Sequence, residues 1–89
     1  MVTVRFTPNL ARHVECVDAT VPGDTVREAL ERVFTDNPRL RGYVLDDQGV
    51  LRKHMVVFLD GLAISDRQGL SDPINGESEI FVMQALSGG

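Results

Sequence analysis

The feature that most constrains the fold is an amphipathic pattern with helical spacing in the first half of the chain. Thr25-x-x-Glu28 has the form of a capping box, Asp24 adds negative charge near the positive end of the helix dipole, and Asn37-Pro38 predicts the end of the helix. Glu28 and Arg32 are spaced as an i,i+4 ion pair on the exposed side. The apolar positions form one stripe: Val26, Ala29, Leu30, Val33 and Phe34. This stripe must pack on a sheet.

Two runs before the helix predict strands. Residues 2–6 alternate between apolar and polar side chains, which is typical of a half-buried strand. The run from Val14 to Val21 is rich in β-branched residues and ends at Pro22-Gly23, a turn signal. We expect two antiparallel strands joined by a loop around residues 8–12.

Shorter strands are expected after the helix. Tyr43 to Leu45 is a short apolar run, followed by a Gly-containing turn at 46–49 and a second short run at 50–52. Met55 to Leu59 is a strong candidate for a central strand. Asp60-Gly61 predicts a tight hairpin turn into residues 62–64, and a polar, turn-rich stretch follows it.

The last run, Ile80 to Leu86, is apolar on both faces, so we expect it in the middle of the sheet beside the first strand. The predicted fold is α+β: a mixed sheet packed on one main helix, the β-grasp architecture of ubiquitin-like proteins. Its size predicts one domain over residues 1–89.

The two faces of this last strand allow two interpretations. Alternation places Phe81 and Met83 in one row and Ile80 and Val82 in the other. Both rows could be covered, by the helix on one side and by loops on the other. Alternatively, one row such as Phe81 and Met83 stays partly exposed and docks partner proteins. The sequence does not decide between them.

Composition argues against several classes of function. The net charge is −4 and no large Lys/Arg cluster occurs, so nucleic acid is not an expected partner. The apolar runs are too short to span a membrane, and the N-terminus does not resemble a signal peptide. With one cysteine, Cys16, no intramolecular disulfide can form, which favours a reducing, cytoplasmic setting.

No self-contained active site is expected. His13 and His54, the two histidines, are far apart in sequence, and Cys16 has no partner at a metal-ligand spacing. We expect Cys16 in the core and His54 on the surface. No Gly-rich phosphate loop is present, so no bound cofactor or metal is expected.

The sequence ends in Gly88-Gly89 after an apolar strand. Glycine has no Cβ, so these residues could thread a narrow channel and leave the terminal carbonyl open to attack. From Leu86 to Gly89 the extended chain can reach at most about 14 Å. A carboxylate reacts with nucleophiles only after activation, for example as an acyl-adenylate. The bland alternatives are a frayed end or a cloning remnant.

The whole chain resembles the ThiS/MoaD family of ubiquitin-like sulfur carrier proteins. The similarity runs through "VTVRF", "DTVREALERVF", "MVVFLDG" and, most specifically, "INGESEIFVMQALSGG". The stretch "YVLDDQGVLRKHMVVFLDG" is similar to the subgroup associated with cysteine synthesis. Some members of that subgroup supply sulfur to specialised metabolites, and the other branches of the family serve molybdopterin and thiamin thiazole formation.

The resemblance implies a carrier that is a monomer when free and is not itself an enzyme. A ubiquitin-activating-type enzyme would adenylate Gly89 with ATP, and sulfur transfer would give a Gly89 thiocarboxylate for a partner synthase. Gly88 would permit entry into the partner, where Ala85, Leu86 and Ser87 would line the groove. One rival is a protein modifier joined to lysines through the same glycine. Another is a β-grasp binding module whose glycines are incidental.

Overall fold

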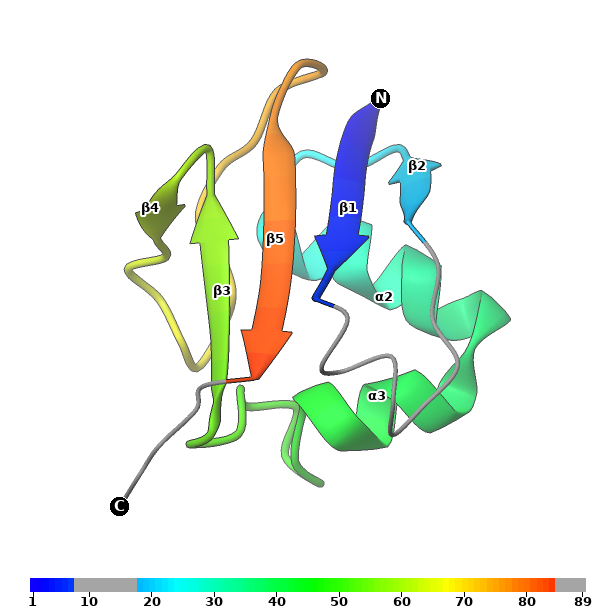
Figure 1. Ribbon diagram of the computed structural model, residues 1–89, viewed down its shortest axis with the longest axis vertical. Helices are drawn as coiled ribbons and strands as arrows, with labels where there is room; N and C mark the ends of the chain where they lie inside the picture. The colour runs from blue at the N-terminus through cyan, green and yellow to red at the C-terminus, as the bar shows by residue number, and fades with distance from the viewer. Residues whose placement is uncertain (8–17, 85–89) are drawn as a thin grey trace.

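The computed structural model describes residues 1–7 and 18–84, and a five-stranded mixed sheet with two helices on one face forms its core (Figure 1). The strand order is β2-β1-β5-β3-β4. The elements are β1 (Val2–Phe6), β2 (Ala19–Val21), α2 (Val26–Asp36), α3 (Pro38–Val44), β3 (Met55–Leu59), β4 (Leu62–Ala63) and β5 (Glu79–Gln84). This arrangement confirms the predicted α+β, β-grasp fold.

The last strand lies in the centre of the sheet, as predicted. β5 runs parallel to β1, with Val4 opposite Ile80, and antiparallel to β3, with Val57 opposite Val82. Ile80 and Val82 are completely buried beneath the helices. The first and last strands, distant in sequence, therefore share one side of the core.

Helix α2 confirms the predicted apolar stripe, because all five stripe residues are buried. The Thr25 hydroxyl accepts a hydrogen bond from the Glu28 amide at 3.2 Å. The Glu28 carboxylate accepts from the amide of Asp24, one residue before the cap, rather than from Thr25. The expected Glu28–Arg32 pair is not among the ion pairs of the described residues, where α2 instead contributes Glu31.

Helix α3 is a correction to the predicted single helix. Asn37-Pro38 ends α2 as expected, but Pro38 then occupies the first turn of α3, where its missing N–H costs no helical hydrogen bond. Leu40 and Val44, four residues apart, bury the inner side of this helix. Tyr43 to Leu45 therefore mostly completes a helix rather than a strand.

The two turns predicted at residues 46–49 and at Asp60-Gly61 are both present. Leu45 forms an isolated bridge with Leu51, and between them the Gly49 amide donates to the Asp46 carbonyl at 3.0 Å. Asp60 and Gly61 both have positive φ angles, 52° and 88°, as a tight hairpin turn requires.

The second predicted strand is shorter than expected within the described part of the chain. β2 begins at Ala19, and Asp18 instead accepts a hydrogen bond from the Phe6 amide at 3.4 Å. The rest of that run, from Val14, and the loop around 8–12 lie outside the described residues.

Neither helix in residues 1–7 and 18–84 is long and apolar enough to cross a membrane.

Candidate functional site

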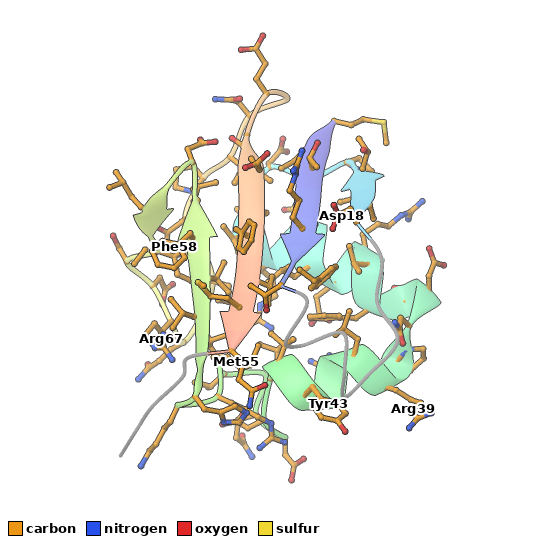
Figure 2. The ribbon with its side chains drawn as sticks, in the orientation of Figure 1. Asp18, Arg39, Tyr43, Met55, Phe58 and Arg67 are labelled. Atoms are coloured by element: carbon orange, nitrogen blue, oxygen red, sulfur yellow. The ribbon has the colours of Figure 1, made fainter. Side chains whose placement is uncertain are left out.

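The sheet face opposite the helices carries an apolar cluster on its two inner strands. Phe58 lies opposite Phe81, and Val56 lies opposite Met83, in the β3–β5 register. All four side chains are half-buried. We call Val56, Phe58, Phe81 and Met83 the open-face cluster; Phe58 is labelled in Figure 2. The row of Ile80 and Val82 therefore faces the helices, and the row of Phe81 and Met83 faces outward.

The two residues from β3 were not singled out in the sequence. The alternation within Met55–Leu59 contains the necessary signal, because it places Val56 and Phe58 in one row and buried Met55 and Val57 in the other. The missing information was the pairing of β3 with β5. Directly opposed aromatic and apolar side chains in an antiparallel pair contact each other and stabilise the sheet.

An ion pair borders the open-face cluster on the β1 side. The Arg5 guanidinium lies 3.2 Å from the Glu79 carboxylate, and both side chains are half-exposed. Arg5 lies opposite Phe81 in the β1–β5 register. An exposed pair of this kind adds little to stability, but it gives the apolar cluster a polar edge.

The far end of the open-face cluster is the end of β5. Gln84 lies opposite Met55, so β5 ends where β3 begins. The predicted tail residues continue from this corner: Ala85, Leu86, Ser87, Gly88 and Gly89 lie outside the described residues. Met83, the last residue of the open-face cluster on β5, is therefore two positions before the first of these tail residues.

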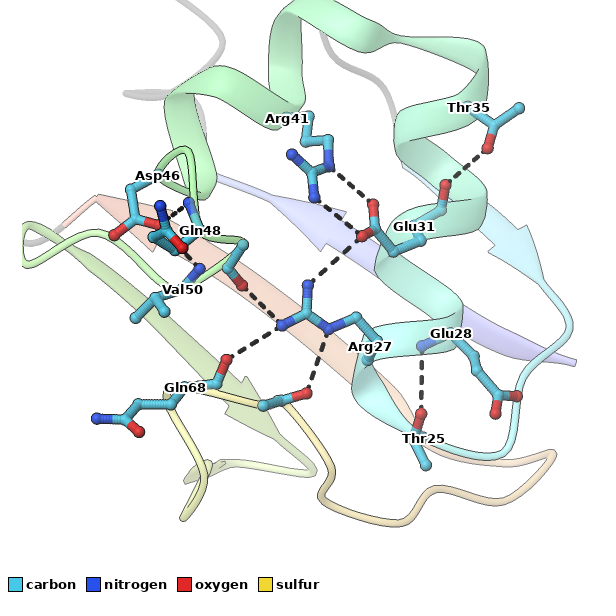
Figure 3. A network of polar contacts seen from close by, with 12 residues as sticks. Thr25, Arg27, Glu28, Glu31, Thr35, Arg41, Asp46, Gln48, Val50 and Gln68 are labelled. Carbon is cyan, nitrogen blue, oxygen red and sulfur yellow. Dashed lines mark hydrogen bonds and ion pairs between the residues drawn. The ribbon is translucent and has the colours of Figure 1, made fainter.

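The helical side contains a polar network centred on Arg27 (Figure 3). Its guanidinium donates to the carbonyls of Gly49 at 2.7 Å, Gln68 at 3.1 Å and Gly69 at 3.2 Å. It also contacts Glu31 at 3.4 Å. These bonds connect α2 to the turn before β3 and to the loop that precedes β5, so we interpret Arg27 as a structural residue.

Glu31 joins both helices in this network. Arg41 of α3 donates to its two carboxylate oxygens at 3.0 Å and 3.2 Å. This hydrogen bonding lowers the pKa of Glu31 and raises the pKa of Arg41. Arg27 and Arg41 thus share one carboxylate partner, Glu31.

The other sequence-predicted residues add no catalytic centre to the described part of the chain. His54 is exposed in the turn before β3, as predicted. His13 and Cys16 lie outside the described residues. In residues 1–7 and 18–84, no group of three His, Cys, Asp or Glu side chains is placed to hold a metal ion.

Comparison with known proteins supports a ubiquitin-like assignment. No family model matches the sequence, and no curated protein matches it. SAMP1 from Haloferax volcanii has a similar structure, with a TM-score of 0.77 and 27% identity over 99% of this chain and 98% of that one.

Two further structures share the fold at lower sequence identity. A chain of the Amycolatopsis orientalis BexX/CysO complex gives a TM-score of 0.82 at 17% identity over the full length of both chains. CysO from Mycobacterium tuberculosis gives 0.80 at 17% identity, covering 97% of this chain and 100% of that one. The protein therefore has the ubiquitin-like β-grasp fold, and its predicted resemblance to ThiS/MoaD-type ubiquitin-like proteins is confirmed.

Proposed function

We propose that this protein is a sulfur carrier whose C-terminal glycine, Gly89, carries the sulfur atom. A ubiquitin-activating-type enzyme adenylates the Gly89 carboxylate with ATP, and pyrophosphate leaves. A hydrosulfide equivalent then displaces AMP from the acyl-adenylate and leaves a thiocarboxylate. A partner synthase consumes this sulfur in the biosynthesis of a small molecule such as cysteine, molybdopterin or thiamin.

The observation that carries this proposal is the place of β5. It is the central strand, fixed on both sides by β1 and β3, and the chain continues from its end towards Gly88-Gly89. A central strand that leads, three residues later, to two glycines without side chains suits the delivery of a carboxylate into another protein. The similarity to CysO chains supports the same kind of protein and favours the cysteine-type branch.

The open-face cluster supplies the docking surface in this proposal. Phe81 and Met83 belong to the strand that leads into the tail, and Val56 and Phe58 extend the apolar area onto β3. Aromatic and methionine side chains are enriched at protein interfaces. Docking through this face would hold the root of the tail while Ala85, Leu86 and Ser87 line the partner's groove.

The test is the mass of the C-terminal peptide after incubation with the adenylating enzyme of the same source, ATP and sulfide. Sulfur for oxygen changes the mass almost as methionine oxidation does, and Met1, Met55 and Met83 can all be oxidised. The protein should therefore be the Cys16→Ser variant, alkylated and fragmented to place the label. A label on Gly89 is expected. An unlabelled tail, with an enzyme that is active on another carrier, would contradict the proposal.

The similarity to SAMP1 favours a second candidate, since SAMP1 is described as a small archaeal modifier protein. In this case the same activated Gly89 forms an isopeptide bond with a lysine of a target protein. Conjugates of higher mass in the source cell that disappear when Gly88-Gly89 is deleted would support the modifier. A thiocarboxylate without such conjugates would support the carrier.

A further inference from the structure

A basic group lies at the corner of the sheet where β5 ends. Arg52 and Lys53 are separated from β3 by His54 alone, and Met55 pairs with Gln84, the last residue of β5. Arg67 reaches the same corner from the loop after β4 and is labelled beside β3 in Figure 2. We call Arg52, Lys53 and Arg67 the basic rim.

Backbone contacts hold the two arginines of this rim in place. One Arg67 nitrogen, Nη2, donates to the carbonyl of Met55 at 2.8 Å and to that of Arg52 at 3.0 Å. Arg52 Nε donates to the Gly42 carbonyl at 2.8 Å, which ties the rim to α3. The Met55 amide closes a turn onto the Arg52 carbonyl at 3.0 Å, and this turn presents exposed Lys53.

The charges of the rim are not neutralised by the described residues. None of the ion pairs in residues 1–7 and 18–84 involves Arg52, Lys53 or Arg67, although neutral carbonyls accept hydrogen bonds from the two arginines. The cations on the helical side, Arg27 and Arg41, by contrast pair with a carboxylate. The rim therefore projects uncompensated positive charge from a protein with a net charge of −4.

The opposite end of β5 is acidic. Asp60 accepts a hydrogen bond from the Glu79 amide at 2.9 Å, and Glu77 lies in the turn just before this strand. Where β5 begins, the carboxylates of Asp60, Glu77 and Glu79 thus outnumber the cations of Arg5 and the Met1 amine, whereas the end that leads into the tail carries the cations of the rim. Such a separation orients a protein as it approaches a charged partner and raises the association rate.

We infer that the basic rim docks on carboxylate side chains of the activating enzyme, around the mouth of the channel that admits the tail. This inference rests on the proposed function. From Gln84 to Gly89 the extended chain spans at most about 21 Å. With the tail extended, the rim lies too far from Gly89 to hold the phosphate of the acyl-adenylate, so its contacts fall on the protein surface outside the channel. Electrostatic complementarity at such an edge governs the association rate and its dependence on salt.

The sequence offers a sharp test, because Lys53 is the only lysine of the chain. A carbodiimide activates carboxylates of the enzyme; the Lys53 amine then attacks, an amide forms, and a urea leaves. The other amine, that of Met1, lies at the opposite end of the sheet, 3.4 Å from the Gly76 carbonyl. We expect peptide mapping to find amides that join Lys53 to Asp or Glu residues of the enzyme, and none through Met1.

Three variants then test the effect of charge on activation. Lys53→Glu reverses the charge at the rim, Lys53→Arg keeps it while removing the reactive amine, and Arg32→Glu makes the same charge reversal on exposed α2. At low salt we expect kcat/KM for the carrier to fall about tenfold in Lys53→Glu and less than about twofold in the other two. The tenfold difference should shrink at about 0.5 M salt, where the Debye length is about 4 Å.

The outcomes separate this inference from the proposed function. One outcome would contradict docking through the rim and still support the carrier function. It is activation of Gly89 in the wild type together with equal changes of kcat/KM in Lys53→Glu and Arg32→Glu. Cross-links through Met1 alone would overturn it as well. Binding of a short RNA that depends on Lys53, without a cross-link to the enzyme, would assign the rim to nucleic acid. A wild-type protein whose Gly89 is not activated would remove both proposals.

Discussion

Phe58 lies directly opposite Phe81 on the sheet face that the helices leave uncovered. The neighbouring residue of β5, Val82, points the other way and is completely buried. Adjacent positions of one strand thus serve different purposes: one side chain stabilises the core, and the next is available to a partner. This difference can be measured.

Replacing Phe81 and Val82 in turn by alanine should separate docking from folding. Val82→Ala should lower the free energy of unfolding by about 2 kcal/mol, because it leaves a cavity in the core, and should change the KM of activation little. Phe81→Ala should lower that free energy by about 1 kcal/mol and raise the KM about tenfold. Urea denaturation and pyrophosphate exchange measure the two quantities. Equal KM values for the variants would contradict docking through Phe81.

The sequence predicted most of the fold because its strongest signals are local. The stripe of α2 and the alternation in β1 follow from residues within a few positions of each other. The missed helix, α3, is seven residues long, too short for a clear period, and its end overlaps the apolar run Tyr43 to Leu45. Pro38 at its first turn was a start signal as well as the stop signal for α2.

The site was harder to predict because it depends on contacts between distant segments. Phe81 and Val82 are both apolar, so sequence alternation alone could not show which row α2 covers. The basic rim also depends on contacts between distant segments. Antiparallel pairing of β3 with β5 brings Arg52 and Lys53 to the end of a strand that lies some thirty positions later in the chain. Only the register of the sheet reveals that these cations lie beside the end of β5.

Two glycines give a matched test of the network around Arg27. Gly49 has φ +77°, and a Cβ there would lie 3.2 Å from Arg27 Nη1, so Gly49→Ala should lower the free energy of unfolding by about 1–2 kcal/mol. Gly42 lies in α3, where an added Cβ would meet nothing within 4 Å. Gly42→Ala should therefore raise that free energy by about 0.5–1 kcal/mol. Urea denaturation compares them, and a Gly49→Ala variant as stable as the wild type would show that the turn tolerates a side chain.

Asp66 makes stability depend on pH in the acidic range. Hydrogen bonds from the Ser71 hydroxyl and then from the Gly69 amide lower the pKa of Asp66 to about 2. Because the folded-state pKa is lowered, the carboxylate stabilises the protein above the unfolded pKa of about 4. This contribution should be lost as the pH falls from about 4 through 2.

The titration of the Asp66 carboxyl by NMR measures this directly. Ser71→Ala removes the hydroxyl donor at 2.6 Å and should raise the pKa of Asp66 towards its usual value. Ser65→Ala is the control, because Ser65 bonds through its backbone amide to Asp72. A pKa for Asp66 that is the same in both variants would show that the hydroxyl does not stabilise the carboxylate.

Gly88→Val tests whether the tail must be narrow. A β-branched side chain next to Gly89 should widen the tail and restrict its backbone, so we expect adenylation to slow about tenfold or more. Gly76→Val makes the same change in an exposed turn at the opposite end of the sheet, where a Cβ would lie 3.5 Å from the Met1 amine. Pyrophosphate exchange should be unchanged in that control. Wild-type exchange in Gly88→Val would show that entry into the enzyme does not require glycine at position 88, even if Gly89 is the residue that is activated.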